Sequence, residues 1–361
     1  MATQSATWAY RDDHEDFART YFRRFGDSVV SSIGVGTYLG EATDEQDDRY
    51  REAIDDALRS GVNVIDTAIN YRHQRSERVV GDAVRESPVD REAVLVATKG
   101  GFLPFDGERP DDPGAFVRLE YIDTGIVDPA DLVHGQHCIA PAFVDDQLDR
   151  SLENLGLDTI DLYYVHNPET QLESNSRDEV YDQLEATFER LEHRRSEGDI
   201  RHYGVATWEA LRVPENHDSY LSLPEMVRRA RTAADAAGND TTGFRGIQLP
   251  FNARMADAFT VESHEGADGV QSALWFAHEA ELSVFTSASL MQGELAAGLP
   301  DEVAAKLDGE TSVQRAINFA RSAPGVTSSL VGMGSPEHVV ENVAAGRYEP
   351  LGASAFDAVF E

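Results

Sequence analysis

Eight short apolar segments, each followed by a longer polar or amphipathic segment, constrain the fold of this chain more than any other feature. The candidate strands are residues 32–38, 62–68, 93–101, 160–167, 201–207, 245–252, 282–289 and 327–333. Parallel strands need long crossover connections, so regular alternation of strands with helices predicts an α/β protein with a parallel sheet.

The segment after the first candidate strand shows the helical pattern most clearly. Residues 50–58 place apolar side chains at i, i+3, i+4, i+7 and i+8. Thr43 and Gln46 match a capping box before them, and Gly61 stands where a helix would end. Similar spacing recurs in residues 144–155 and 180–191. Eight such units in about 320 residues predict a closed (β/α)8 TIM barrel, with an open doubly wound sheet as the alternative.

This pattern also suggests a domain organisation. Residues 1–28 form an irregular N-terminal extension, residues 29–350 a single barrel domain, and residues 351–361 a C-terminal tail. Residues 102–140 are rich in Gly, Pro and Asp and lack a clear period, so they are expected to form an inserted loop over the C-terminal face. The insertion is interpreted as a lid or specificity loop, or else as a surface excursion without a role.

Three consecutive predicted strands end in polar residues that a buried strand would normally exclude: Asp66, Lys99 and His166. Alternation of side chains directs Lys99 and His166 inward. An isolated buried ammonium is very costly, and Asp66 on the neighbouring strand is its natural partner. A purely structural ion pair would satisfy this demand as well.

Tyr71 favours a catalytic reading, because it follows Asp66 closely enough to fold back towards the same end of the barrel. A lysine about 4 Å from the phenol, at an effective dielectric near 20, would favour the phenolate by roughly 4 kcal/mol, or about three pKa units. Asp66 would then hold Lys99 while Lys99 tunes Tyr71. His166 could orient an oxygen or share its proton.

In this order and placement, Asp66, Tyr71, Lys99 and His166 resemble the catalytic tetrad of the aldo-keto reductases, which are NAD(P)-dependent barrel oxidoreductases. The segments that carry the resemblance are GVNVIDTAINY, ATKGG and DLYYVHNP. The resemblance implies hydride transfer between nicotinamide C4 and a carbonyl or alcohol, with Tyr71 as general acid or base. It also implies a small carbonyl or polyol as substrate.

Later segments resemble the cofactor positions of that family less completely. The residues that the resemblance assigns to the cofactor are Thr37, Asn167, Thr207, Gln248, Ser287, Leu290, Gly332, Ser335, His338, Glu341 and Asn342. Ser287 stands where the family has a tyrosine that stacks on the nicotinamide, so the resemblance implies no aromatic platform at this position. The cofactor is expected to be NADP(H) or NAD(H). Because Gly332, Gly334 and His338 replace the usual lysine or arginine near the 2′-phosphate, NAD(H) or dual use is favoured.

Other motifs are given less weight. Residues 34–40 (GVGTYLG) resemble a dinucleotide fingerprint, but the last interval is one residue too long, so they are assigned to the first barrel strand. His134, His137 and Cys138 lack a spaced fourth ligand, so no metal is expected.

Three further residues stand just past Tyr71. Arg72, His73 and Arg75 are interpreted as lining the substrate entrance or as the start of an exposed helix.

Composition narrows the partners and the environment. The net charge of −34 suggests adaptation to high salt, and it disfavours nucleic acid as a partner. The sequence shows no apolar window of membrane-spanning length and no basic, then apolar N-terminus, so a soluble cytoplasmic protein without a membrane partner is expected. The single cysteine fits a reducing compartment. The oligomeric state is not indicated.

Two other functions fit the same residues. Lys99 at the end of a barrel strand could form a Schiff base with a carbonyl substrate in a lyase. The fold could also serve a cofactor-sensing binding subunit without turnover, because fold does not determine function.

Overall fold

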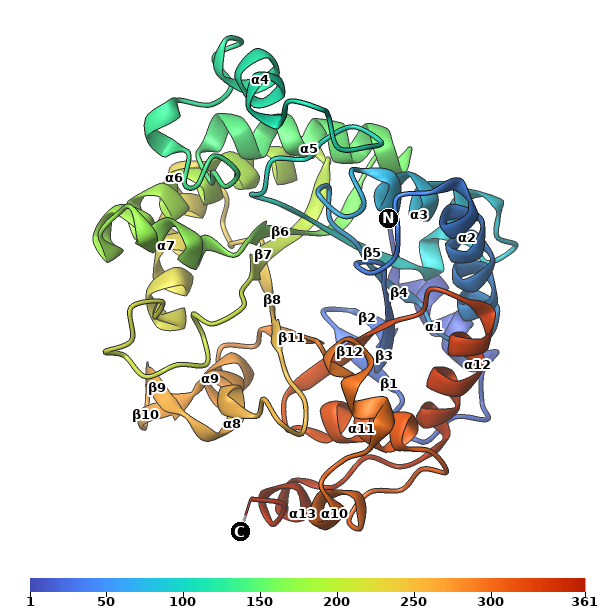
Figure 1. Ribbon diagram of the computed structural model, residues 1–361. Helices are drawn as coiled ribbons and strands as arrows, with labels where there is room; N and C mark the ends of the chain where they lie inside the picture. The colour runs from blue at the N-terminus through green and yellow to red at the C-terminus, as the bar shows by residue number, and fades with distance from the viewer. Residues whose placement is uncertain (361) are drawn as a thin grey trace.

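The computed structural model describes residues 1–360, and at its centre eight parallel strands form a closed barrel (Figure 1). The order around the barrel is β11-β12-β3-β4-β5-β6-β7-β8. The barrel strands are β3 (Ile33–Gly36), β4 (Val64–Asp66), β5 (Leu95–Gly100), β6 (Ile160–His166), β7 (Ile200–Ala206), β8 (Phe244–Pro250), β11 (Ser283–Ser287) and β12 (Val326–Gly332). Each corresponds to one predicted strand, and residues 34–36 of the glycine-rich segment lie in β3 as expected.

Helices follow every barrel strand and surround the barrel. They are α2 (Asp44–Arg59), α3 (Arg75–Glu86), α5 (Pro141–Leu155), α6 (Arg177–Glu197), α7 (Leu223–Ala236), α9 (Ala273–Glu279), α11 (Ser312–Ser322) and α12 (Pro336–Ala344). The chain is therefore an α/β protein with the (β/α)8 TIM barrel fold, and the open-sheet alternative is wrong. Closure places the carboxyl ends of all eight strands at one rim, where catalytic groups of such barrels gather.

Helix α2 shows how the local sequence directs this fold. The Thr43 side chain accepts a hydrogen bond from the Gln46 backbone N–H, and the apolar face over residues 50–58 is buried. Gly61, with φ of 94°, turns the chain after the helix. The capping box is only half formed, because the Gln46 side chain donates instead to the Gly334 carbonyl, 3.2 Å away.

The N-terminal segment is not irregular, as the sequence had suggested. Residues Gln4–Asp12 form helix α1, and β1 (Phe22–Phe25) pairs with β2 (Ser28–Ser31) as an antiparallel hairpin. Phe25 and Val30 of the hairpin belong to the same apolar cluster as the barrel-interior residues Leu95 and Leu162. Their burial closes the end of the barrel opposite the rim formed by the carboxyl ends of the strands, and the sequence-based prediction missed it because each element is short.

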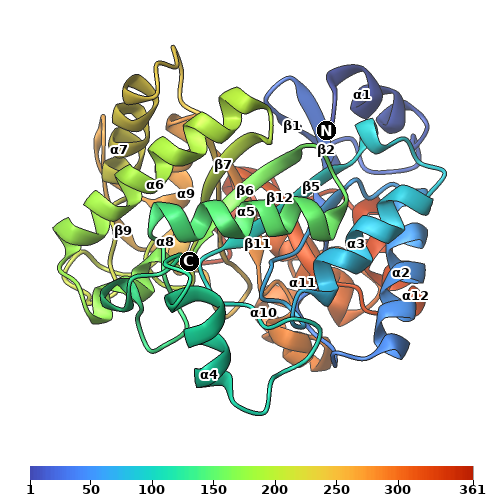
Figure 2. The same ribbon diagram turned by 90° about the horizontal axis from the view of Figure 1, so that it is seen from above.

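The insertion after β5 contains α4 (Pro113–Val117) and a single π-helical turn (Arg118–Ile122). It has a small apolar core of its own, in which Leu103, Val117 and Tyr121 pack against Phe143 of α5. Figure 2 shows α4 and the β1–β2 hairpin at opposite ends of the molecule.

Smaller elements complete the fold: α8 (Asp257–Thr260), the hairpin β9 (Glu262–Gly266) with β10 (Gly269–Ser272), α10 (Asp301–Ala304) and α13 (Ala353–Asp357). Within residues 1–360 no helix has the length and apolar character needed to cross a membrane.

Candidate active site

A buried ion pair lies at the carboxyl end of β4 and β5. The Lys99 Nζ atom donates to Asp66 Oδ2 at 2.6 Å and to the Thr67 carbonyl at 2.7 Å. Gln248 on β8 donates to the other Asp66 oxygen at 2.7 Å. Lys99 is fully buried. Burial lowers its pKa, but Asp66 and Tyr71 together raise it by more than burial lowers it. The pKa of Lys99 is therefore raised overall, and the side chain stays an ammonium.

Tyr71 lies in the turn after β4, and its ring reaches this ion pair. The Lys99 Nζ atom lies 4.8 Å from the centre of the Tyr71 ring. Burial raises the pKa of Tyr71 above its usual value of 10, and the Lys99 ammonium only partly offsets that rise. The expectation that Lys99 would give the phenol a lowered pKa is therefore wrong for this structure, because desolvation outweighs the cation. Tyr71 is a neutral phenol and a proton donor.

His166 ends β6 beside the phenol, with 6.0 Å between the centres of the His166 and Tyr71 rings. Burial lowers the pKa of His166 well below 6.5, and Lys99 and His137 lower it further. The imidazole is therefore neutral near pH 7. Its Nδ1 atom is buried without a hydrogen-bond partner among the described residues, which leaves one ring nitrogen uncommitted.

The insertion supports His166 through residues that the sequence did not single out for this purpose. His137 Nε2 lies 2.8 Å from the His166 carbonyl oxygen, and Gln171 donates to His137 Nδ1 at 2.9 Å. These two contacts require a neutral His137 that carries its proton on Nε2. Phe102 packs edge-on against His166, with ring centres 5.0 Å apart. The insertion is thus joined to the carboxyl-end rim of the barrel by contacts that no local sequence signal marks.

The three residues considered for a metal site go to different places. His134 pairs with Glu173 on the surface, His137 faces His166, and Cys138 is buried in the apolar core of the insertion. Among residues 1–360 no group of three or more potential ligands is arranged to hold a metal ion.

A family model supplies the comparison that identifies the protein. The model of the aldo/keto reductase family matches residues 32–220, which include Asp66, Tyr71, Lys99 and His166. The chain belongs to the aldo/keto reductase family.

Several curated members are similar in sequence. The chain is 30% identical over 205 residues to the NADH-specific methylglyoxal reductase of Escherichia coli, covering 55% of this chain and 54% of that protein. It is 26% identical over 181 residues to an uncharacterized oxidoreductase of Bacillus subtilis, covering 50% of this chain and 46% of that protein. The matches thus span about half the length of these two relatives. A putative voltage-gated potassium channel subunit beta of Schizosaccharomyces pombe is 24% identical over 360 residues, covering 90% and 87%.

Solved structures of aldo-keto reductases share the whole fold. The holo form of aldo-keto reductase AKR11C1 from Bacillus halodurans is 21% identical, with a TM-score of 0.63 and coverage of 94% of this chain and 95% of that one. A Klebsiella pneumoniae aldo/keto reductase solved with NADP and acetate is 21% identical, with a TM-score of 0.61 and coverage of 94% of this chain and 94% of that one. The glycerol dehydrogenase AKR11B4 of Gluconobacter oxydans is 19% identical, with a TM-score of 0.66 and coverage of 95% of this chain and 95% of that one. At these identities the likeness establishes the fold alone.

The positions expected to hold the family's cofactor follow the barrel strands. Thr37, Asn167, Thr207, Ser287 and Leu290 lie just after, or at the end of, β3, β6, β7 and β11. The Thr37 hydroxyl is buried and donates to the Asp66 carbonyl at 3.2 Å. Gln248 is turned towards Asp66 rather than left free, so its amide nitrogen is already engaged.

A second group of these positions surrounds the N-terminus of α12. Gly332 is exposed and borders open space, since an added Cβ would meet nothing within 4 Å. Ser335 is the N-cap residue of α12, His338 and Glu341 lie in the helix, and Asn342 donates to the Gly332 carbonyl at 3.4 Å. The open space beside Gly332 and the N-terminus of α12 fit a phosphate of a dinucleotide, while the Asn342 amide is already engaged by the Gly332 carbonyl.

Proposed function

We propose that this protein is an NAD(P)-dependent oxidoreductase that interconverts a small carbonyl compound and its alcohol. The observation that carries the proposal is the contact of Tyr71 with a buried Lys99–Asp66 pair at the catalytic rim. A buried ion pair alone would be structural. A phenol held against it, beside a neutral imidazole, is an arrangement suited to moving a proton.

Tyr71 acts as general acid in reduction and as general base in oxidation. Its raised pKa keeps the proton on the phenol before the reaction. As negative charge forms on the substrate oxygen, the proton passes to that oxygen and the Lys99 ammonium stabilises the phenolate left behind. Asp66 keeps Lys99 in place and prevents a lone buried cation.

His166 orients the substrate oxygen as a neutral hydrogen-bond donor. Its lowered pKa excludes an imidazolium that would compete with Lys99 beside the phenol. The His166–His137–Gln171 chain of hydrogen bonds fixes the strand end that carries this imidazole.

The nicotinamide cofactor would supply or accept the hydride, held by the residues named above between Thr37 and Asn342. Hydrogen bonding to its own backbone N–H and to Ser335 lowers the pKa of Glu337, so a carboxylate occupies the N-terminus of α12. Arg49 and His338 also lower the pKa of Glu337, so this helix N-terminus carries charges of both signs and does not by itself distinguish NAD(H) from NADP(H).

Two of the relatives suggest the substrate class. One is named for methylglyoxal and another for glycerol, both small oxygenated compounds. We therefore expect an aldehyde, a ketone or a polyol rather than a large apolar substrate.

The Tyr71→Phe variant tests the proposal. Removal of one oxygen should leave the cofactor dissociation constant within about twofold and lower turnover by at least about 100-fold, the range for loss of a general acid. Cofactor binding is measured by fluorescence titration with NAD(H) and NADP(H), and turnover by nicotinamide absorbance across a carbonyl and polyol panel. Turnover retained in Tyr71→Phe would reject the assignment.

One comparison bears on a second candidate, a cofactor-sensing subunit without turnover: a relative matched over 87% of its own length is named a putative potassium channel subunit beta and not an oxidoreductase. Tight cofactor binding without turnover of any compound in the panel would support that candidate. The Schiff-base lyase is disfavoured, because such a lysine attacks as a neutral amine whereas Lys99 has a raised pKa.

A further inference from the structure

The turn that follows Tyr71 has an unusual backbone. Arg72, His73 and Gln74 all have positive φ, at 49°, 58° and 70°. This left-handed region is unfavourable for residues with a Cβ, and three such residues in succession are held there only if their surroundings impose it. The unfavourable segment directly follows the proposed general acid.

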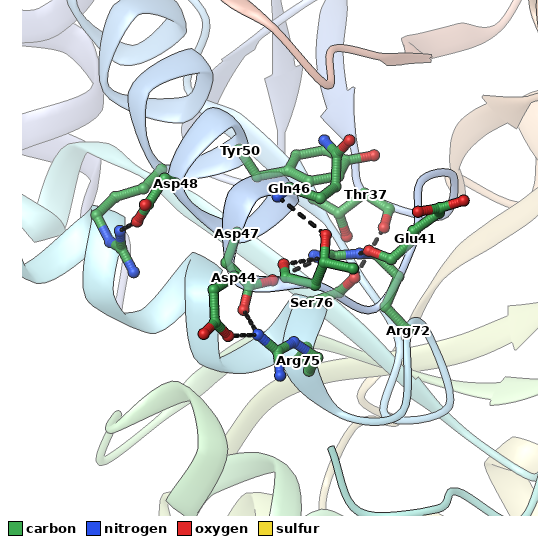
Figure 3. Close-up of polar contacts among 12 residues, drawn as sticks. Thr37, Glu41, Asp44, Gln46, Asp47, Asp48, Tyr50, Arg72, Arg75 and Ser76 are labelled. Atoms are coloured by element: carbon green, nitrogen blue, oxygen red, sulfur yellow. Dashed lines mark hydrogen bonds and ion pairs between the residues drawn. The ribbon is translucent and has the colours of Figure 1, made fainter. Parts of the chain in front are cut away.

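Arg72 is the residue that turns inward from this segment. Its side chain is 2% exposed, although the sequence suggested a substrate entrance or an exposed helix start. Its Nη2 atom pairs with Asp47 Oδ1 at 2.5 Å, and its Nε atom donates to the Glu41 carbonyl at 2.9 Å. The guanidinium carbon lies 5.2 Å from the centre of the Tyr50 ring. Figure 3 shows Arg72 extending from its own turn towards the residues that begin α2.

The neighbouring residues strengthen the same attachment. Arg75 pairs with Asp44 and with Asp47, so one carboxylate of α2 receives both arginines. The Ser76 hydroxyl donates to the Thr37 carbonyl at 2.9 Å, which joins the start of α3 to the end of the first barrel strand (Figure 3).

The other side of the turn is held by the insertion. The Gly107 backbone N–H donates to the His73 carbonyl at 2.8 Å, and the Gln74 side chain donates to the Phe105 carbonyl at 2.9 Å. The turn is thus fixed from two sides, yet the contacts on the insertion side are neutral. The charged, buried contact is that of Arg72 with Asp47.

We propose that Arg72 is the positioning residue of Tyr71: its buried contact with Asp47 imposes the left-handed turn that keeps the phenol against Lys99. The inference rests on the proposed role of Tyr71 as general acid. It adds helix α2 to the parts of the molecule that turnover requires, although no residue of α2 touches Tyr71 in the contacts described.

The chemistry of the side chain explains why arginine serves here. The planar fork of the guanidinium reaches a carboxylate and a carbonyl in two directions while its face lies over Tyr50. An ammonium at the same place would keep the charge but not both directed contacts. Arg72→Lys should therefore restore only part of the function that Arg72→Gln loses.

The test compares Arg72→Gln, Asp47→Asn and Arg72→Lys with the unmodified protein. Displacement of a reacting group by about 1 Å costs on the order of 100-fold, so we expect kcat to fall by about 10- to 100-fold in Arg72→Gln. The cofactor dissociation constant should change by less than about twofold, because the hydrogen bonds of Arg72 go to Glu41, Thr43 and Asp47 and not to the residues assigned to the cofactor. The solvent isotope effect on kcat should rise, because proton transfer by a displaced phenol becomes slower relative to the other steps.

The matched control is Arg51→Gln. Arg51 pairs with Asp48 at 2.6 Å on the outer side of the same helix, and Asp48 is 77% exposed. This variant should leave kcat, cofactor affinity and isotope effect unchanged. If Arg72→Gln does not fold, Asp47→Asn, which keeps the side-chain volume, is compared with Arg75→Gln. Asp47→Asn weakens the contacts of both arginines, so only a loss of kcat beyond that of Arg75→Gln is assigned to Arg72.

The outcomes separate the two proposals. If Tyr71→Phe is inactive while the folded Arg72 and Asp47 variants keep normal kcat and isotope effect, the positioning role is rejected and the proposed function stands. If Tyr71→Phe retains turnover, the function itself is rejected. A fall in kcat that tracks only a lower melting temperature, with no change in the isotope effect, would also overturn the positioning role.

Discussion

The Nζ atom of Lys99 lies 2.6 Å from Oδ2 of Asp66 inside the mouth of the barrel, and the Gln248 side chain donates a hydrogen bond to the second carboxylate oxygen. The two charges lie on adjacent parallel strands: Asp66 ends β4 and pairs with Ala97 of β5, two residues before Lys99. Their burial makes them mutually dependent, because either charge alone would be costly at that depth.

Lys99→Met should destabilise the fold as well as remove activity. Loss of the ammonium leaves Asp66 buried and unpaired, which costs about 3–5 kcal/mol in comparable pairs. Urea denaturation measures the free energy of unfolding. The double variant Lys99→Met/Asp66→Asn should recover part of that stability without recovering turnover. Equal stability of the single and double variants would show that the pair is not coupled as described.

Gly101→Ala should damage the position of His166. Gly101 has φ of 144°, and an added Cβ would lie 2.8 Å from the His166 carbonyl oxygen. The strand end carrying the imidazole would have to shift, so kcat should fall by about tenfold or more. Gly298→Ala is the control, because Gly298 has a similar φ of 152° but would place its Cβ in open space. Equal losses in both variants would point to backbone strain rather than to His166.

His137 should make the protein sensitive to acid. Burial lowers the pKa of His137 from 6.5 to about 4, so the unfolded chain binds a proton in a range where the folded chain does not. Its contribution to stability is complete above pH 6.5 and is lost as the pH falls towards 4, by roughly 3 kcal/mol over that range. His137→Gln should lower stability at pH 7 yet flatten this decline. Unfolding free energies at several pH values between 7 and 4 measure it; an unchanged slope would contradict the assignment.

High salt should stabilise the protein. With a net charge of −34, repulsion among surface carboxylates opposes folding at low ionic strength. Because the Debye length shortens from about 10 Å at 0.1 M to about 3 Å at 1 M, the melting temperature should rise with KCl over this interval. A sucrose series serves as the control for effects that do not depend on charge. A melting temperature that stays flat in KCl would argue against adaptation to high salt.

Much of the architecture could be predicted from local pattern. Most barrel strands are short runs rich in apolar residues, because strands of a parallel barrel are covered by helices outside and by each other's side chains inside. Strands β7, β8 and β12 also carry polar residues. The apolar face of α2 and its Thr43 N-cap could likewise be predicted from the sequence pattern. The hairpin that closes the barrel was not, because Phe25 and Val30 are buried by partners far away in the sequence.

The candidate site divides in the same way. Asp66, Lys99 and His166 could be proposed because each is a polar residue at the end of an apolar strand, and parallel strands end at the same rim. The direction in which the pKa of Tyr71 shifts could not be predicted. It depends on the balance between desolvation and the Lys99 cation, which only the packed site determines. Arg72 shows the limit most clearly: its neighbours in sequence indicate a polar surface, while its side chain is buried.

The sequence by itself therefore determined the order of strands and helices, the parallel pairing of the strands and the polar residues at their carboxyl ends, since these follow from periodicity and strand direction. The closure of the sheet into a barrel, in place of an open sheet, was decided by the tertiary structure. Only the tertiary structure decided which distant groups surround them: the hairpin in the barrel floor, His137 behind His166, and Asp47 against Arg72. The physical reason is that burial and charge pairing depend on distances across the fold, and the linear order of residues does not specify those distances.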